Sequence, residues 1–226
     1  MRSPNSAYLR FLAVAYAALL SIAPGAPAPV SAADDPLGPA VEAARKTHDE
    51  KQLQSLKAQL EQMIAQNPND AGLYLDLAKV QEYFLDVYET RKDKKAAGEA
   101  VDKAIDAAQQ SIQLTDKSAD AHSLLADLYG RKISLGNAMF AGPKFGPKVK
   151  EENAKAMALD EKNPRVWASL GRQYLMTPKM FGGDVAKSIE SFQKSLAFDT
   201  SQDETRTEYE IAWVELPGSR QFLRCV

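Results

Sequence analysis

The sequence has few of the side chains on which most protein chemistry depends. Its 226 residues include one cysteine, Cys225, and two histidines, His48 and His122. A single cysteine excludes an intrachain disulfide, and with two distant histidines it does not form a metal-ligand pattern. The G-x-S-x-G motif of many serine hydrolases does not occur. The sequence therefore predicts a protein that is not an enzyme and that holds neither a metal nor a cofactor.

Long apolar runs are also missing. The run of small and apolar residues at 11–22 is shorter than the roughly 20 residues that cross a bilayer. It follows Arg2 and is followed by small residues up to Ala33, which is the pattern of a secretory signal peptide. We expect residues 1–33 to be removed and the mature chain to be periplasmic or secreted, soluble and without a transmembrane segment. The alternatives are a disordered Ala/Pro-rich leader and a retained anchor.

Neither sign of charge dominates. The chain has 28 basic and 30 acidic residues, and removal of residues 1–33 would leave 26 basic and 30 acidic ones. This mildly acidic balance argues against a nucleic-acid partner. The basic stretch at 91–95, RKDKK, lacks interleaved aromatic residues and is interpreted as a solvated loop tip.

A repeated pattern is present instead. Residues 167–174 match W-x2-L-G-x2-Y, the first-helix signature of a tetratricopeptide repeat (TPR). Related copies begin at Tyr74 and at His122, which takes the Trp position and is interpreted as a packing residue. A small residue is needed where two helices touch, and large residues fill the space beside it. The signature residues are Tyr74, Leu77, Ala78, Leu125, Ala126, Tyr129, Trp167, Leu170 and Gly171.

Second helices and connections follow the same repeat. Apolar patterns at 56–64, 104–114, 149–159 and 188–196 fit second helices, the last with Phe192 in the aromatic position. Each connection to the next first helix has one length, because Pro68 to Tyr74, Asp116 to His122 and Glu161 to Trp167 are each six residues apart. This predicts an all-α solenoid of antiparallel, TPR-like helix pairs. The alternative is an ordinary helical bundle whose Leu/Ala periodicity imitates repeats.

The repeat is longer than the usual one. Tyr74 to His122 is 48 residues and His122 to Trp167 is 45, against about 34 in a standard repeat. The excess lies between the two helices of each pair, and we expect long insertions that form a rim on one edge. Residues 82–88 are expected to continue the first helix and 94–99 to begin the second, whereas 139–147 are too rich in Gly and Pro for a helix.

The third insertion, residues 176–184, contains the only Gly pair. Gly182 and Gly183 predict a tight turn that needs a positive φ, and Asp184 a helix N-cap. The alternative for the Gly pair is an anion site at the start of the next helix, which the neighbouring Asp184 disfavours.

Large apolar side chains gather in the last two insertions. They either pack over helix ends or form an apolar pocket or a partner-binding rim, for which flexible Met side chains are suited. The binding candidates are Phe140, Phe145, Tyr174, Met180 and Phe181, with Met139 and Met176 beside them. His48 lies in the charged stretch THDEK and is interpreted as a solvated helical residue.

The turn P-x-x-F-G-G-D at 178–184 resembles that of exported bacterial TPR proteins with long insertions. By pattern, residues 36–205 are similar to the T-component family of TRAP-type transporters. This resemblance implies an all-helical, periplasmic oligomer that passes hydrophobic ligands. The chain departs from that family in lacking the cysteine for lipid attachment.

We therefore expect a signal peptide at 1–33, a TPR-like domain at 34–205 and an incomplete or atypical repeat at 206–226. The last segment is either truncated or an apolar end that pairs with a second copy of the chain. Two functions remain open: a scaffold that binds a protein or peptide on the concave face, and a carrier of a small apolar ligand. A pocket lined by the Phe and Met side chains would favour the carrier, and an open polar groove the scaffold.

Overall fold

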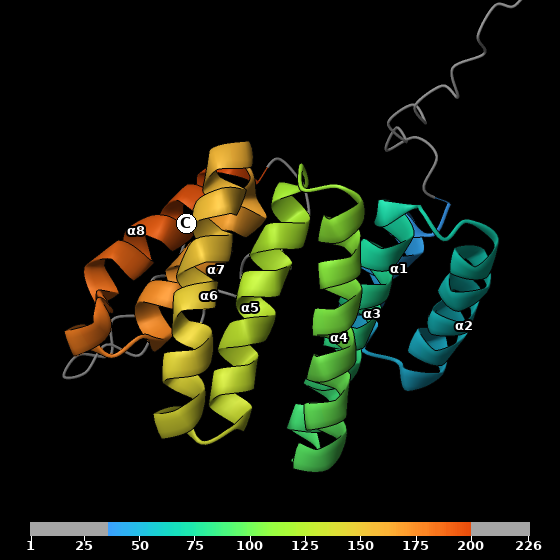
Figure 1. Cartoon of the computed structure of the whole chain (residues 1–226), viewed down its shortest axis with the longest axis horizontal. Coiled ribbons are helices and arrows are strands. Elements are labelled where there is room, and N and C mark those ends of the chain that lie inside the picture. Colours follow the sequence, from blue (N-terminus) through green and yellow to red (C-terminus); the bar gives the residue numbers. More distant parts are fainter. Residues whose placement is uncertain (1–35, 200–226) are drawn as a thin grey trace, which may run out of the picture. The chain divides into compact units, whose positions relative to one another are not determined.

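The computed structural model describes residues 36–199, and within this range every regular element is helical (Figure 1). The signal peptide predicted at 1–33, the atypical repeat at 206–226 and Cys225 lie outside the described residues. The all-α prediction is confirmed for the described part. The elements are α1 (Gly38–Thr47), α2 (Glu50–Gln66), α3 (Ala71–Thr90), α4 (Lys94–Leu114), α5 (Ala119–Leu135), α6 (Ala138–Leu159), α7 (Pro164–Met176), the 3-10 turn η2 (Lys179–Phe181) and α8 (Val185–Phe198).

Helices α2 to α8 begin at residues that cap them. In each case a side-chain oxygen accepts a hydrogen bond from a backbone N–H of the first turn, which would otherwise lack a partner. His48, expected within a helix, instead ends α1 in a left-handed conformation with φ 46°. The expectation was wrong because Asp49 caps α2 directly after it. The capping residues are Asp49, Asp70, Asp93, Ser118, Asn137, Asn163 and Asp184.

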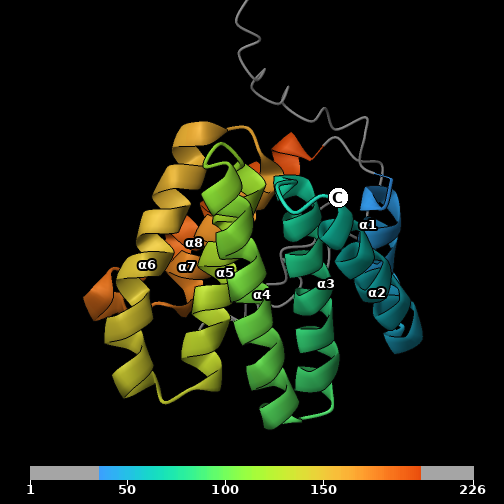
Figure 2. The same ribbon diagram turned by 45° about the vertical axis from the view of Figure 1, so that its right-hand side comes forward.

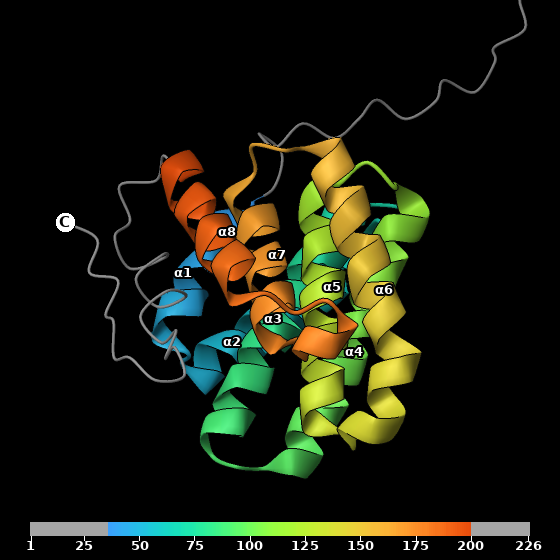
Figure 3. The same ribbon diagram turned by 90° about the vertical axis from the view of Figure 1, so that its left-hand side faces the viewer.

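The helices pack as consecutive antiparallel pairs. The contacts within the pairs α3–α4, α5–α6 and α7–α8 are the most extensive, and α2, α4 and α6 each also contact the following helix. Figure 2 shows these pairs following one another in chain order, and Figure 3 turns the α7–α8 pair toward the viewer. The first helices α1, α3, α5 and α7 also contact one another in sequence. Side chains from these four helices can therefore meet on one side of the array.

Close helix contacts explain the small residues of the pattern. A Cβ at Gly171 would lie only 2.8 Å from the ring of Phe192, so α7 and α8 approach each other where a side chain is absent. Two serines of α8 reinforce this contact. Ser188 Oγ donates to the Gly171 carbonyl at 2.9 Å, and Ser195 Oγ donates to the Pro164 carbonyl at 2.7 Å.

The constant six-residue spacing also has a physical basis. Trp167 Nε1 donates to the carbonyl of Glu161 at 2.7 Å. His122 Nε2 lies 3.2 Å from the carbonyl of Asp116, the equivalent position one repeat earlier. Each ring nitrogen thus binds the connection that leads into its own helix, which fixes the length of that connection.

The expectation that residues 139–147 are not helical is wrong, because α6 includes both Pro143 and Pro147. A proline normally disfavours helix in the residue before it by contacting that residue's Cβ. Here the preceding residues are Gly142 and Gly146, which have no Cβ and no neighbouring atoms within 4 Å of its place. Phe145 anchors this part of α6, because its ring stacks on Tyr129 of α5 with centroids 5.6 Å apart.

The predicted long insertions are therefore mostly helix. As expected, α3 continues beyond residue 88 and α4 starts at Lys94, and the turn between α5 and α6 is also short. Only the α7–α8 connection is a loop. In it Gly182 has φ 99°, and a Cβ at Gly183 would lie 1.7 Å from the Thr177 carbonyl oxygen. The predicted rim of long loops is limited to this connection.

Candidate functional site

A charged pocket lies where the first helices meet. Its volume is about 60 Å³, and its walls come from α1, α3, α5, α7 and the end of α8. Among the described residues, the principal side chains that line this pocket are Arg45, Glu82, Ser123, Asp127, Arg165 and Arg172. We call it the charged pocket.

Two arginines of α7 are paired across the pocket. Arg172 binds Asp127 of α5 through both Nη2 and Nε, the latter at 3.1 Å. Arg165 Nη2 donates to Glu42 Oε1 of α1 at 2.5 Å, although 123 residues separate them. Burial alone would lower the pKa of Arg165, but the charge of Glu42 and then that of Asp120 raise it above its usual value. Carboxylates of α5 and α1 therefore hold both guanidinium groups in place.

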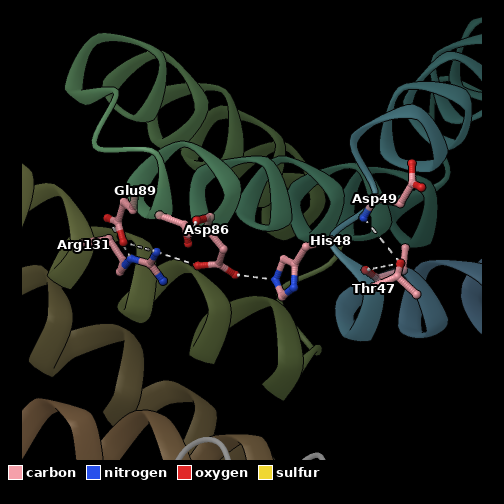
Figure 4. A network of polar contacts seen from close by, with 8 residues as sticks. Thr47, His48, Asp49, Asp86, Glu89 and Arg131 are labelled. Atoms are coloured by element: carbon pink, nitrogen blue, oxygen red, sulfur yellow. Dashed lines mark hydrogen bonds and ion pairs between the residues drawn. The ribbon is translucent and has the colours of Figure 1, made fainter.

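A second ionic cluster extends from the pocket along α3 (Figure 4). Arg131 of α5 donates to Asp86 and to Glu89, each at 2.6 Å, and His48 Nε2 lies 3.4 Å from Asp86. Burial acts to raise the pKa of Asp86, but hydrogen bonds from His48 and Arg131 lower it below its usual value. Asp86 is thus an anion with partners on both sides.

Glu82 differs from these carboxylates. It lines the charged pocket and is partly buried, yet no hydrogen bond or ion pair joins it to another residue of the range 36–199. Burial, followed by the charges of Asp86 and Asp127, raises the pKa of Glu82 to about 7. Arg131 and Arg172 lower the pKa of Glu82, but each has a smaller effect than burial, Asp86 or Asp127. The pocket therefore disfavours the negative charge that Glu82 would carry.

The adjacent Tyr83 shows the same lack of a partner. It is 2% exposed, and its hydroxyl oxygen has no hydrogen-bond partner in the described part of the chain. Burial, and then the charge of Glu42, raises the pKa of Tyr83 above its usual range. The charges of Arg165, Glu82 and Arg45, which line the pocket, also act on the pKa of Tyr83, but Tyr83 itself does not line the pocket.

The binding candidates from the sequence lie elsewhere. Phe140, Met180 and Phe181 are 75%, 83% and 61% exposed at the α5–α6 and α7–α8 connections. Phe145 packs on Tyr129 and under Lys148, whose Nζ lies 5.9 Å from the Phe145 ring centroid. Tyr174 is partly buried, with Lys187 Nζ 5.7 Å from its ring. None of these five lines the charged pocket as the described residues define it.

The repeat residues occupy packing positions. His122 is buried, and its Nδ1 lies 2.5 Å from Glu152 of α6. The signature residues that are fully buried are Ala78, Leu125, Ala126, Tyr129, Gly171, Gly183 and Phe192, while Tyr74, Leu77, Trp167 and Leu170 are partly buried and Gly182 is exposed.

The residues of the charged pocket were not recognised from the sequence, although one signal was present. In all three copies of the first-helix pattern, the residue after the small one is charged: Lys79, Asp127 and Arg172. Two of these line the pocket or pair across it, and Lys79 lies 3.3 Å from Glu42. A charged residue that recurs at a helix-contact position indicates ion pairs between neighbouring first helices.

Fold and site together define an all-α protein of stacked helix pairs with an ionic pocket between its first helices. The sequence model of one family, described as regulator of microtubule dynamics protein 1-3, matches residues 40–176. This match covers more than half of the chain and extends from α1 to α7, so the chain belongs to this family. No curated protein sequence matches the chain. Within residues 36–199, no helix has both the length and the apolarity needed to cross a membrane.

Proposed function

We propose that the chain is a non-catalytic, TPR-like scaffold of an exported compartment that binds a protein segment or peptide at the charged pocket. The observation that carries this proposal is the composition of the pocket, whose walls are mainly charged and hydroxyl side chains from four first helices. A peptide offers amide and polar groups that can bind such side chains. An apolar ligand would remove them from water without replacing their hydrogen bonds.

A second candidate is a carrier of a small apolar ligand, in line with the resemblance to transporter T-components. The exposed Met and Phe side chains at the helix connections support it, because five of them exceed 60% exposure. They lie at the α5–α6 and α7–α8 connections and do not line the charged pocket. The residues are Met139, Phe140, Met176, Met180 and Phe181.

The family description adds a third partner to test. It names microtubule dynamics, which makes polymerised tubulin a defined macromolecule that can be mixed with the purified chain. If the chain cosediments with microtubules, and a substitution that reverses a charge of the pocket abolishes this cosedimentation, tubulin would be the partner of the scaffold.

The scaffold proposal is tested by selecting peptides from a random library on the full chain and measuring their affinity by calorimetry. Arg45→Glu reverses a charge that lines the pocket, and we expect it to weaken the selected peptides at least about tenfold. Arg91→Glu is the matched control, because Arg91 lies at the α3–α4 turn with its side chain 56% exposed. Equal effects of the two variants would contradict the proposal. Native mass spectra would favour the carrier instead if they showed a bound molecule that organic solvent extracts and that the Phe181→Ala variant does not retain.

A further inference from the structure

The cations around the charged pocket already have partners. Arg172 is bound to Asp127, Arg165 to Glu42, and Arg131 to Asp86 and Glu89. Arg45 is also engaged. Glu82 lies among these groups without a hydrogen bond or ion pair to any described residue. The pocket therefore contains a carboxylate that its own arginines do not neutralise.

The hydroxyl of Tyr83, the next residue on α3, is also buried without a hydrogen-bond partner among residues 36–199. Tyr83 does not line the pocket, so among these two residues only Glu82 offers the pocket a polar group without a described partner. Taking a carboxylate partly out of water without a hydrogen bond is unfavourable. Glu82 therefore points to a ligand that supplies hydrogen bonds from outside the described chain.

The charges at this position select the kind of ligand. Asp86 and Asp127 raise the pKa of Glu82 more than Arg131 and Arg172 lower it, so the local balance repels a further anion. An apolar group would leave Glu82 unpaired. A cationic group would supply hydrogen bonds to the carboxylate and stabilise its charged form. A volume of about 60 Å³ accommodates an ammonium or guanidinium head group, since one water occupies roughly 10–15 Å³ on the same scale.

We infer that the charged pocket receives an alkylammonium or guanidinium group, with Glu82 as its counter-ion. This inference rests on the proposed scaffold function, in which the cation is a lysine or arginine side chain of the bound segment. A free diamine carries the same chemistry and is the alternative source.

The test uses calorimetry on the full chain with pentapeptides that differ only in a central Lys, Arg, norleucine or Glu. We expect the Lys or Arg peptide to bind at least about tenfold more tightly than the norleucine and Glu peptides. Glu82→Gln keeps the size of the side chain and should abolish this preference. Glu190→Gln is the matched control, because Glu190 lies on α8 with its side chain 62% exposed.

The outcomes separate this inference from the scaffold proposal. Peptides that bind without preference for a cation, or whose affinity Glu82→Gln leaves unchanged, would overturn the inference and leave the scaffold intact. Binding of cadaverine alone, lost in Glu82→Gln, would support the cation subsite with a free diamine as its source and count against the scaffold. Binding of neither cadaverine nor any pentapeptide would overturn the inference, while the library selection tests the scaffold separately.

Discussion

At the scale of single residues, Glu82 makes the stability of the fold depend on pH. Its pKa is about 7 in the folded chain and about 4.5 when exposed. The folded state therefore keeps the Glu82 proton over a range in which the unfolded state loses it. The stability associated with this proton is fully present below pH 4.5 and is lost as the pH rises through about 7. Converted by linkage, the loss is at most about 3 kcal/mol.

We predict that Glu82→Gln reduces this pH dependence. Wild type and variant should differ in free energy of unfolding by about 1–3 kcal/mol more at pH 8 than at pH 4.5, with the wild type the weaker at pH 8. Urea denaturation at the two pH values measures the difference. The same experiment on Glu190→Gln should show no comparable change between the two pH values. A constant difference between wild type and Glu82→Gln across this range would contradict the role assigned to the carboxylate.

Residues that act within one helix pair could be predicted from the sequence, whereas those that act across pairs could not. Gly171 follows from the pattern because it takes the small-residue position of the first-helix signature, and in the structure its missing Cβ makes room for the ring of Phe192. The partner of Arg165 is Glu42, 123 residues earlier in the chain. Hydrophobic periodicity gives the buried face of a helix, but it does not say which charges meet across the array. The residues of the charged pocket could therefore be recognised only from the three-dimensional arrangement of the helices.

At the scale of elements, α6 shows how local sequence can mislead. Its first half contains two prolines and two glycines, a composition typical of a loop. The order of these residues matters more than their number, because each proline follows a glycine. Packing of Phe145 on Tyr129 then stabilises a helix that its composition disfavours. The helix caps, in contrast, are local signals, and the Asp184 cap predicted from the sequence is present in the structure.

We predict that the effect of Gly142→Ala changes sign with its neighbour. Beside Pro143 the new Cβ should contact the proline ring, so the free energy of unfolding should fall by about 1 kcal/mol. In a Pro143→Ala background the same change should raise it by up to about 1 kcal/mol, because Ala favours helix over Gly. Chemical denaturation of the two single variants and the double variant measures this coupling. Additive effects would show that Gly142 is not needed for the proline.

At the scale of the whole described unit, the ion pair between Glu42 and Arg165 links its first helix to its seventh. Glu42 also lies 3.3 Å from Lys79 of α3, so it contacts cations on two of the following first helices, α3 and α7. The side chains are 36% and 20% exposed, which makes the pair partly screened by solvent. We therefore expect loss of this ion pair to lower the free energy of unfolding by more than loss of a surface ion pair would, and by less than loss of one partner of a fully buried pair would.

We predict that Glu42→Gln lowers the free energy of unfolding by about 1–2 kcal/mol at low ionic strength. The difference from wild type should shrink when the salt concentration is raised to about 1 M, because salt screens partly exposed charges. Glu61→Gln is a suitable comparison. It removes an i,i+4 pair with Lys57 on α2, in which the Glu61 side chain is 54% exposed, and it should change stability by no more than about 0.5 kcal/mol. Equal losses in the two variants would contradict a special role for the contact between α1 and α7.

The same ion pair has a consequence for how the helices come apart. In an ordinary repeat array each unit contacts only its neighbours, so either end can open while the remainder stays folded. Here an opening of α1 also removes a contact of α7, and an opening of α7 removes one of α1. Fraying at one end is thereby coupled to fraying at the other. Amide hydrogens in α1 and α7 should exchange with similar protection, although 123 residues separate the two side chains that couple them.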